Sequence, residues 1–234
     1  MNKKNLERKI KLKPEDLSEI KNAVIDAEKK TSGEIVLAMC SESSSYAFWE
    51  LLTAFATSVV LMCCIFPLAP QIYSWLGKFI WSVQPWHLLS TYFVITAICI
   101  FLLYFLFQIP LIDSFIIPQE AKNKSVTNKS LRYFTESNVY NTKNHSGILI
   151  FVSYFEKQVR IVADKGISEK ISQDLWNLIA DEMTENFSHG QVKNAFLCAV
   201  KKCGDLLAEN FPAQNENPNE LSDGLVILED EKWV

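Results

Sequence analysis

The hydropathy pattern is dominated by two apolar stretches in the middle of the chain. Residues 51–77 and 79–112 contain no Asp, Glu, Lys or Arg. A helix needs about 20 apolar residues to cross the hydrocarbon core of a bilayer, and both stretches are long enough. The pattern therefore predicts a transmembrane hairpin over 47–112, with spans at about 48–69 and 86–109.

The segment before the hairpin, residues 1–46, has the pattern of one helix and one strand. Apolar residues recur at helical spacing over 14–31, after Pro14, which suits the first turn of a helix. Gly33 then precedes the apolar run 34–40, which is typical of a buried strand. We expect an α-β unit here.

The segment after the hairpin, residues 120–211, is expected to form the main part of the same domain. The predicted elements are a helix within 129–140, strands at 148–155 and 159–163, a helix capped by Ser168 and ended at His189-Gly190, and a helix at 191–210. The turn candidate Glu156-Lys157 makes the two strands a hairpin. The tail, residues 212–234, is rich in Asn, Glu and Pro and is expected to be irregular.

The strands at 34–40 and 148–155 are both of the fully apolar kind that is buried on two faces. Such strands are typical of parallel sheets, so we expect the two to pair in parallel across a crossover. The transmembrane hairpin then lies inside that crossover, as an insertion after the first strand. This predicts an α/β fold that is interrupted by its membrane segment.

The positive charges around the spans predict their orientation. Nine Lys and Arg side chains precede the first span, and four more follow the second span closely, whereas the connecting loop contains only Lys78. By the positive-inside rule both termini are expected in the cytoplasm, with a multi-pass arrangement in a bacterial inner membrane. The first forty residues lack the apolar region of a signal peptide, so cleavage is not expected.

Composition excludes several classes of function. The net charge of −4 provides no basic footprint, so no nucleic-acid partner is expected. The six cysteines form neither a CxxC pair nor a zinc spacing, and they are expected to be reduced thiols. The phosphate-binding GxxxxGK, the GxSxG nucleophile turn and the HExxH zinc motif are absent from the sequence.

Several short motifs after the hairpin resemble one known family. They are Gly147–Ser153, Phe155-Glu156-Lys157, Val159, Ala163–Ile167, Trp176, His189-Gly190, Phe211-Pro212 and Asn219-Glu220-Leu221. In their order and spacing, over residues 131–228, they are similar to the TPM domain family. The resemblance implies an α/β/α sandwich. It also implies relatives of three kinds: acid phosphatases, proteins that bind a divalent cation such as calcium, and auxiliary or assembly factors of membrane complexes.

Three carboxylates are candidate ligands for such a cation. Asp164 follows a buried strand directly, while Asp174 and Asp181 recur on one face of the predicted helix. Carboxylate oxygens are the ligands that calcium prefers. The alternatives are that Asp164 caps the next helix or pairs with Lys165, and that the helical carboxylates form a solvated face.

Two functions follow from these observations. The uncharged spans and the resemblance favour a membrane-anchored binding or assembly module, whose partners are the lipid bilayer and a protein in the membrane. The alternative is a divalent-metal-dependent phosphatase with Asp164 at its site. A transporter or channel is disfavoured, because no ionisable residue lies in the middle of either span. Glu50 and His87 lie at the ends of the spans.

Overall fold

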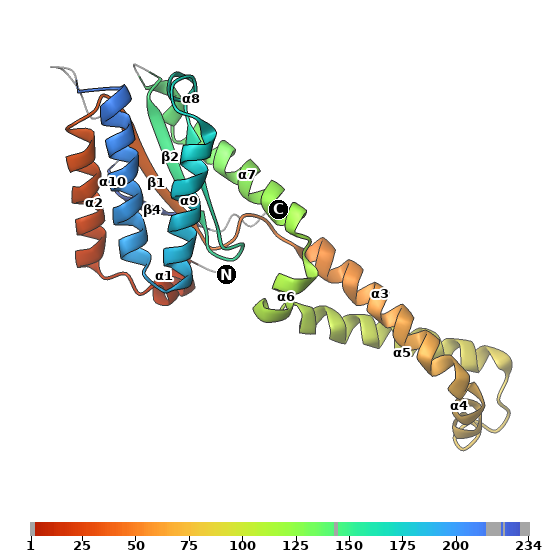
Figure 1. Ribbon diagram of the computed structural model, residues 1–234. Coiled ribbons are helices and arrows are strands. Elements are labelled where there is room, and N and C mark those ends of the chain that lie inside the picture. Colours follow the sequence, from red (N-terminus) through yellow and green to blue (C-terminus); the bar gives the residue numbers. More distant parts are fainter. Residues whose placement is uncertain (1–2, 143–144, 214–220, 222, 230–234) are drawn as a thin grey trace. The chain divides into compact units, whose positions relative to one another are not determined.

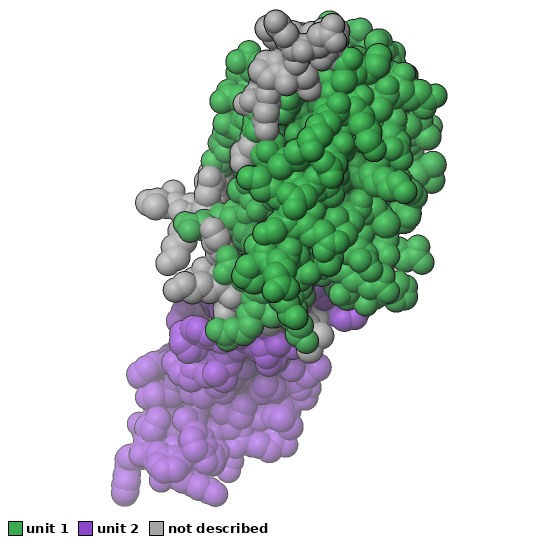
Figure 2. Space-filling model, turned by 90° about the vertical axis from the view of Figure 1, so that its left-hand side faces the viewer, with its two compact units in different colours: residues 1–44, 122–234 green, residues 45–121 purple. Residues whose placement is uncertain are grey.

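A computed structural model describes residues 3–142, 145–213, 221 and 223–229 (Figure 1). The chain divides into two compact units, coloured separately in Figure 2. The sheet unit consists of residues 1–44 and 122–234, and the helical unit consists of residues 45–121. The sheet unit is therefore built from segments on both sides of the helical unit in the sequence.

The sheet has four strands in the order β3-β2-β1-β4. They are β1 (Glu34–Cys40), β2 (Gly147–Ser153), β3 (Gln158–Ala163) and β4 (Leu225–Ile227). Strand β1 pairs in parallel with β2 over its whole length, and with β4 on its other side. Strands β2 and β3 form an antiparallel hairpin. Both expected pairings, the parallel one across the crossover and the hairpin, are confirmed.

The two central strands, β1 and β2, are buried on both faces, which explains the continuous apolar runs 35–40 and 148–152 within them. One face packs against α2 (Pro14–Glu28), α9 (Gln173–Ser188) and α10 (Val192–Asn210), around Trp176 and Phe196. The other face packs against Val126 of α7 (Gln119–Glu136) and Val139 of the short helix η2 (Val139–Asn141). The result is an α/β/α sandwich, as the resemblance to the TPM domain family implies.

The helical unit contains two helical stretches, Ala47–Leu76 and Pro85–Phe107, that are long and apolar enough to cross a membrane. The first consists of α3 (Ala47–Ile65), η1 (Phe66–Leu68) and α4 (Ala69–Leu76), and the second is α5 (Pro85–Phe107). Helices α3 and α5 pack against each other, and α6 (Pro110–Ile116) follows α5. Most large apolar side chains of α3 and α5 are exposed to the surroundings.

Three local predictions are corrected. Helix α1 (Lys3–Ile10) was not expected, because its sequence is highly charged, but Leu6 and Ile10 are buried in the core. Ser168 does not cap the long helix: it ends the short helix α8 (Lys165–Ser168), and Ser172 precedes α9. Helix α7 begins at Gln119, ten residues before the expected 129–140.

The tail after Pro212 is not irregular throughout, because residues 225–227 form β4. Three residues are too few to produce a periodic pattern, and pairing with β1 is what orders them as a strand. Of the tail motif Asn219-Glu220-Leu221, the first two residues lie outside the described part of the chain, and Leu221 packs against the α7 side of the sheet.

Candidate functional site

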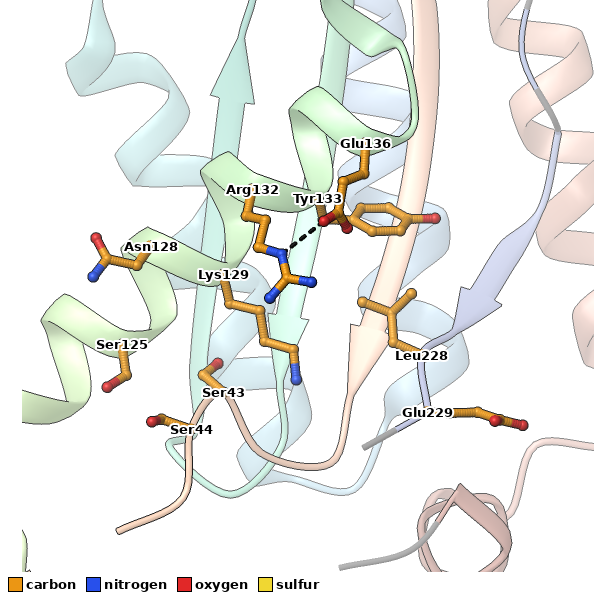
Figure 3. Close-up of a pocket in the computed structure, with 10 residues that line it drawn as sticks. All are labelled: Ser43, Ser44, Ser125, Asn128, Lys129, Arg132, Tyr133, Glu136, Leu228 and Glu229. Carbon is orange, nitrogen blue, oxygen red and sulfur yellow. Dashed lines mark hydrogen bonds and ion pairs between the residues drawn. The ribbon is translucent and has the colours of Figure 1, made fainter. Parts of the chain in front are cut away.

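A cavity of about 480 Å³ opens at the carboxyl ends of β1 and β4 (Figure 3). We call it the carboxyl-end cavity. Its walls come from the loop after β1, one face of α7 and the residues after β4, and consist of Ser43, Ser44, Ser125, Asn128, Lys129, Arg132, Tyr133, Glu136, Leu228 and Glu229. The carboxyl edge of parallel strands is where open α/β sheets usually bind ligands.

Two cations of α7 extend toward the strand ends in this cavity (Figure 3). The Lys129 ammonium donates to the backbone carbonyl of Glu42 at 2.7 Å, and the Arg132 Nε donates to the Glu136 carboxylate at 2.7 Å. Glu229 lies beyond Leu228 on the wall formed by the end of β4. The cavity therefore contains cations and carboxylates together.

The loop wall of the cavity is fixed by a buried carboxylate. Glu156, in the turn between β2 and β3, is 6% exposed and accepts a hydrogen bond of 2.8 Å from the Ser43 backbone N–H. It also accepts from the hydroxyl of Ser153, which lies 2.7 Å from the Ser43 hydroxyl. These bonds hold the loop after β1 against the end of β2, so this wall has a defined position.

Cys40 ends β1 next to this serine cluster. Its sulfur lies 3.4 Å from the Ser153 hydroxyl. Burial raises the pKa of the Cys40 thiol, although Lys129 acts in the opposite direction. The thiol is therefore neutral at physiological pH, and it lacks the thiolate character of a catalytic nucleophile.

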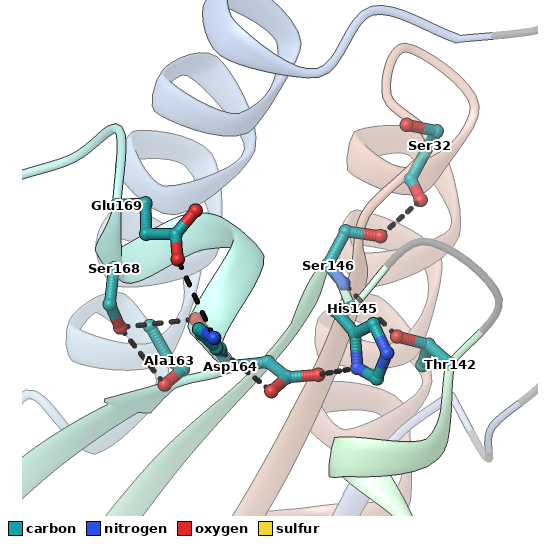
Figure 4. Close-up of polar contacts among 9 residues, drawn as sticks. Ser32, Thr142, His145, Ser146, Ala163, Asp164, Ser168 and Glu169 are labelled. Atoms are coloured by element: carbon teal, nitrogen blue, oxygen red, sulfur yellow. Dashed lines mark hydrogen bonds and ion pairs between the residues drawn. The ribbon is translucent and has the colours of Figure 1, made fainter.

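A second polar group lies at the opposite, amino-terminal end of β2 (Figure 4). Asp164 is 8% exposed and is the N-cap of α8, where its Oδ1 accepts from the Lys165 backbone N–H at 2.6 Å. Its Oδ2 lies 3.2 Å from Nδ1 of His145, whose side chain is 65% exposed. Asp164 thus caps the next helix, and it also holds an imidazole whose other face is open to solvent.

The structure does not bring the three candidate metal ligands together. Asp174 lies in the first turn of α9 and is exposed. Asp181 is also exposed and lines a separate cavity of about 270 Å³, together with Arg160, Gln173 and Asn177. Among the described residues, no group of three His, Cys, Asp or Glu side chains is placed to hold a metal ion.

The carboxyl-end cavity was missed by the sequence reasoning. Lys129 and Arg132 belong to the four positive charges that follow the second span and predict its orientation, and no motif in the sequence marks Ser43 as a binding residue. The position of Ser43 was the one signal in the sequence that pointed to the cavity, because polar residues that follow the carboxyl end of a parallel strand commonly bind ligands. The contribution of β4 could not be foreseen.

Comparisons with known proteins agree with this architecture. Residues 112–206 match the TPM domain. No curated protein matches the chain. Among solved structures, the chain is similar to the BA42 protein of the psychrophilic bacterium Bizionia argentinensis, determined by NMR, with a TM-score of 0.54 and 20% identity over 92% of this chain and 94% of that one. At this identity the similarity shows the fold alone.

Proposed function

We propose that this chain, whose residues 112–206 match the TPM domain, is a membrane-anchored TPM-domain protein that binds a protein partner in the same membrane. In this proposal α3 and α5 cross a bacterial inner membrane as a hairpin, and the sheet unit lies in the cytoplasm. The membrane helices bind lipid and partner helices. The sheet unit faces the cytoplasmic surface of the complex.

The observation that carries the anchoring is the pairing of β1 with β2. These strands precede and follow the helical unit in the sequence, yet seven residues of each are paired in parallel, from Glu34 with Gly147 to Cys40 with Ser153. Both must therefore lie on the same side of any membrane that the chain crosses. An even number of crossings satisfies this condition, and the two apolar helical stretches supply that number.

The exposed surface of the helical unit supports the role in binding. Large apolar side chains point outward along α3 and α5, including Phe55, Phe93 and Phe101, each more than half exposed. The stretches that form these helices carry no charged residue between positions 51 and 77 or between 79 and 112. Helices of this kind are suited to contact with lipid and with other apolar helices, rather than to ion conduction.

Topology reporters test the anchoring. A reporter fused after Val234 is expected to be active in the cytoplasm, and a reporter inserted beside Lys78 is expected to be active on the opposite side. The chain should also remain with the membrane pellet after alkaline carbonate extraction. A fusion at Val234 that is active only outside the cytoplasm would contradict the proposed orientation.

Site-specific photo-crosslinking tests the partner. A crosslinking residue placed at Phe93 or at Phe101 in α5 is expected to capture one and the same membrane protein in native membranes. Leu178 in α9 is the control position, because it is equally exposed but lies in the sheet unit. Repeated recovery of the monomer alone from both α5 positions would count against an assembly role.

The contact between His145 and Asp164 favours a second candidate function, a phosphatase. A buried carboxylate that orients an exposed imidazole is an arrangement suited to general acid–base catalysis. The test is hydrolysis of an aryl phosphate by the full chain in detergent, with and without chelator. Activity that survives both chelator and Asp164→Asn would exclude a metal site built on this residue.

A further inference from the structure

We propose that the outer face of α1 and the turn that follows it bind anionic phospholipid head groups on the cytoplasmic surface of the membrane. The inference rests on the membrane anchoring proposed above, and it adds an attachment through charge to the attachment through the apolar helices. Its basis is a cluster of exposed cations at the edge of the sheet from which the chain leads into α3.

The charge of this segment is opposite to that of the whole chain. Residues 3–13 contain six Lys or Arg and one acidic residue, Glu7, whereas the whole chain has a net charge of −4. Four of these cations have exposed side chains, and we call them the basic cluster: Arg8, Lys9, Lys11 and Lys13. A local excess of positive charge on an acidic protein is typical of a surface that binds an anionic partner.

Helix α1 directs the basic cluster outward because its other face belongs to the core. Leu6 and Ile10 are four positions apart, so they share one face of the helix, and both are buried in the main core of the sheet unit. Arg8 lies midway between them in the sequence and therefore projects from the opposite face. Within the described part of the chain, neither Arg8 nor Lys11 forms an ion pair with a carboxylate.

The acidic residues nearest in the sequence do not neutralise the basic cluster. Asp16 and Glu19 in α2 both pair with Lys193 of α10, where the ammonium lies 3.3 Å from the Asp16 carboxylate. Glu7 and Glu15 are exposed, and these two carboxylates are outnumbered by the four cations. The surface around α1 therefore keeps an excess of positive charge.

Helix α1 lies at the carboxyl edge of β1, where the chain leaves the sheet unit (Figure 1). The Lys9 ammonium lies 5.9 Å from the centroid of the Tyr154 ring. The backbone N–H of Tyr154 in turn donates to the carbonyl of Cys40, the last residue of β1, at 3.1 Å. These contacts place the basic cluster beside the start of the connection to α3.

That connection is too short to let this edge of the sheet move far from a bilayer. Ser43, which is held by Glu156, precedes the first residue of α3, Ala47, by four residues, and these span at most about 14 Å. The charge-free stretch starts at Leu51, about 6 Å further along the helix. Because the head-group layer extends about 5–8 Å outward from the hydrocarbon core, the edge lies at most about 15 Å from it.

An anionic bilayer surface matches the way in which these cations are arranged. The basic cluster extends over six positions of a helix and a turn, and its side chains are exposed. Each Lys or Arg that comes within a Debye length of an anionic leaflet, about 8–10 Å at physiological salt, adds attraction of its own. Such a surface binds through the sum of these attractions and requires no preformed pocket.

Amide hydrogen exchange of the full chain in lipid nanodiscs tests the proposal. One preparation contains phosphatidylcholine alone, and the other contains phosphatidylcholine with phosphatidylglycerol as a minority component. Peptides from residues 3–13 should exchange about tenfold more slowly with phosphatidylglycerol, because bound α1 opens less often. Molar salt, at which the Debye length is about 3 Å, should remove the difference. Peptides from α10 are the internal reference and should exchange equally in both preparations.

Two double variants locate the contact. Arg8→Gln with Lys11→Gln removes two charges of the basic cluster and leaves the buried face of α1 intact, so the slowing should fall from about tenfold to about threefold. Lys30→Gln with Lys201→Gln is the matched control, because it removes two charges at exposed positions outside residues 3–13. The control should keep the full slowing. A circular dichroism spectrum of each variant verifies folding.

The proposal is overturned if residues 3–13 exchange equally in the two preparations, or if the two double variants show the same slowing. Protection of α1 in native membranes but not with phosphatidylglycerol would assign the basic cluster to an acidic protein, and it would overturn the proposal as well. Alkaline carbonate separates this failure from failure of the anchoring. A chain that carbonate extracts refutes the anchoring, whereas a retained chain without any dependence on phosphatidylglycerol refutes the lipid contact of α1 alone.

Discussion

The backbone N–H of Ser43 donates a hydrogen bond of 2.8 Å to the carboxylate of Glu156, although the two residues are 113 positions apart. The whole helical unit lies between them in the sequence. This bond joins the loop that leads out of β1 toward the first apolar helix to the turn between β2 and β3. Glu156 therefore closes the sheet unit at the point in the sequence where the helical unit interrupts it.

Removal of the Glu156 carboxylate should destabilise the sheet unit. In Glu156→Ala the buried N–H of Ser43 and the hydroxyl of Ser153 lose this acceptor, and a buried polar group left unpaired costs about 1–3 kcal/mol. The measurement is the free energy of unfolding of the full chain in detergent. Glu169→Ala is the control, because Glu169 is an exposed carboxylate, and a change within about 0.5 kcal/mol is expected there. Equal effects of the two substitutions would contradict the role of Glu156.

Replacement of Asp164 by alanine and by asparagine should affect stability differently. Asp164→Ala removes the N-cap of α8 and should cost about 1 kcal/mol of unfolding free energy. Asp164→Asn keeps an acceptor for the Lys165 N–H, since Asn is an equally good N-cap, and should lie within about 0.5 kcal/mol of the unmodified protein. Denaturant titration distinguishes the two. If Asn destabilises as much as Ala, the charge beside His145, and not the cap, is the stabilising feature.

Glu28 should make the stability depend on pH. Burial raises the pKa of this carboxyl to about 8, against the opposing effect of the Ile35 backbone N–H, and the neighbouring carboxylates of Glu34 and Asp223 raise it further. The folded state therefore keeps a proton that the unfolded chain loses above its ordinary pKa of 4.5. The unfolded state binds fewer protons between these values, so this contribution to stability falls as the pH rises from about 4.5 to about 8.

Glu28→Gln should flatten that pH dependence. The amide oxygen can still accept from the Ile35 N–H at the position where Oε1 now accepts at 2.8 Å, and no proton has to be held. We expect the variant to gain melting temperature relative to the unmodified chain at pH 8 but not at pH 5. Glu15→Gln, at an exposed position of the same helix, should change the melting temperature by the same amount at pH 8 and at pH 5. If the melting temperatures of Glu28→Gln and of the unmodified chain differed by the same amount at every pH, the raised pKa of Glu28 would be refuted.

Gly204 allows α10 to approach α2 closely. A Cβ added at this position would lie 2.7 Å from the Cβ of Ala27. Gly204→Ala should therefore destabilise the sheet unit by about 1–2 kcal/mol, because overpacking outweighs the gain of about 1 kcal/mol in helix propensity. The double variant Gly204→Ala with Ala27→Gly removes the opposing methyl group and should recover part of the loss in thermal unfolding. No recovery would mean that the contact with Ala27 is not the cause.

The elements that could be predicted were those with a strong local signal. Strands β1 and β2 are runs of seven residues buried on both faces, so their sequences are apolar apart from Glu34 at the start of β1 and Ser153 at the end of β2. Helix α10 was predicted within one residue of its observed start at Val192. In contrast, α1 and β4 are ordered by contacts with distant segments, such as the burial of Leu6 in the core and the pairing of Val226 with Ala38.

The candidate site was less predictable than the fold, because a site depends on which side chains meet. Asp164 could be identified as a polar residue after a strand, but its contact with His145 depends on the backbone around β2 and β3. Asp174 and Asp181 share a helix, and nothing in their spacing revealed that Asp164 would lie apart from them at the start of α8.

Two properties of this protein follow from local composition alone: two helices able to cross a membrane, and an α/β domain that is interrupted by them. Both depend on the length and polarity of continuous segments, which determine how a segment partitions between water and an apolar environment. The carboxyl-end cavity depended on tertiary structure, because its wall residues come from positions 43–44, 125–136 and 228–229. Those segments meet only when β1, α7 and β4 assemble around one sheet, since the pairing of β4 with β1 is what places Leu228 and Glu229 opposite α7.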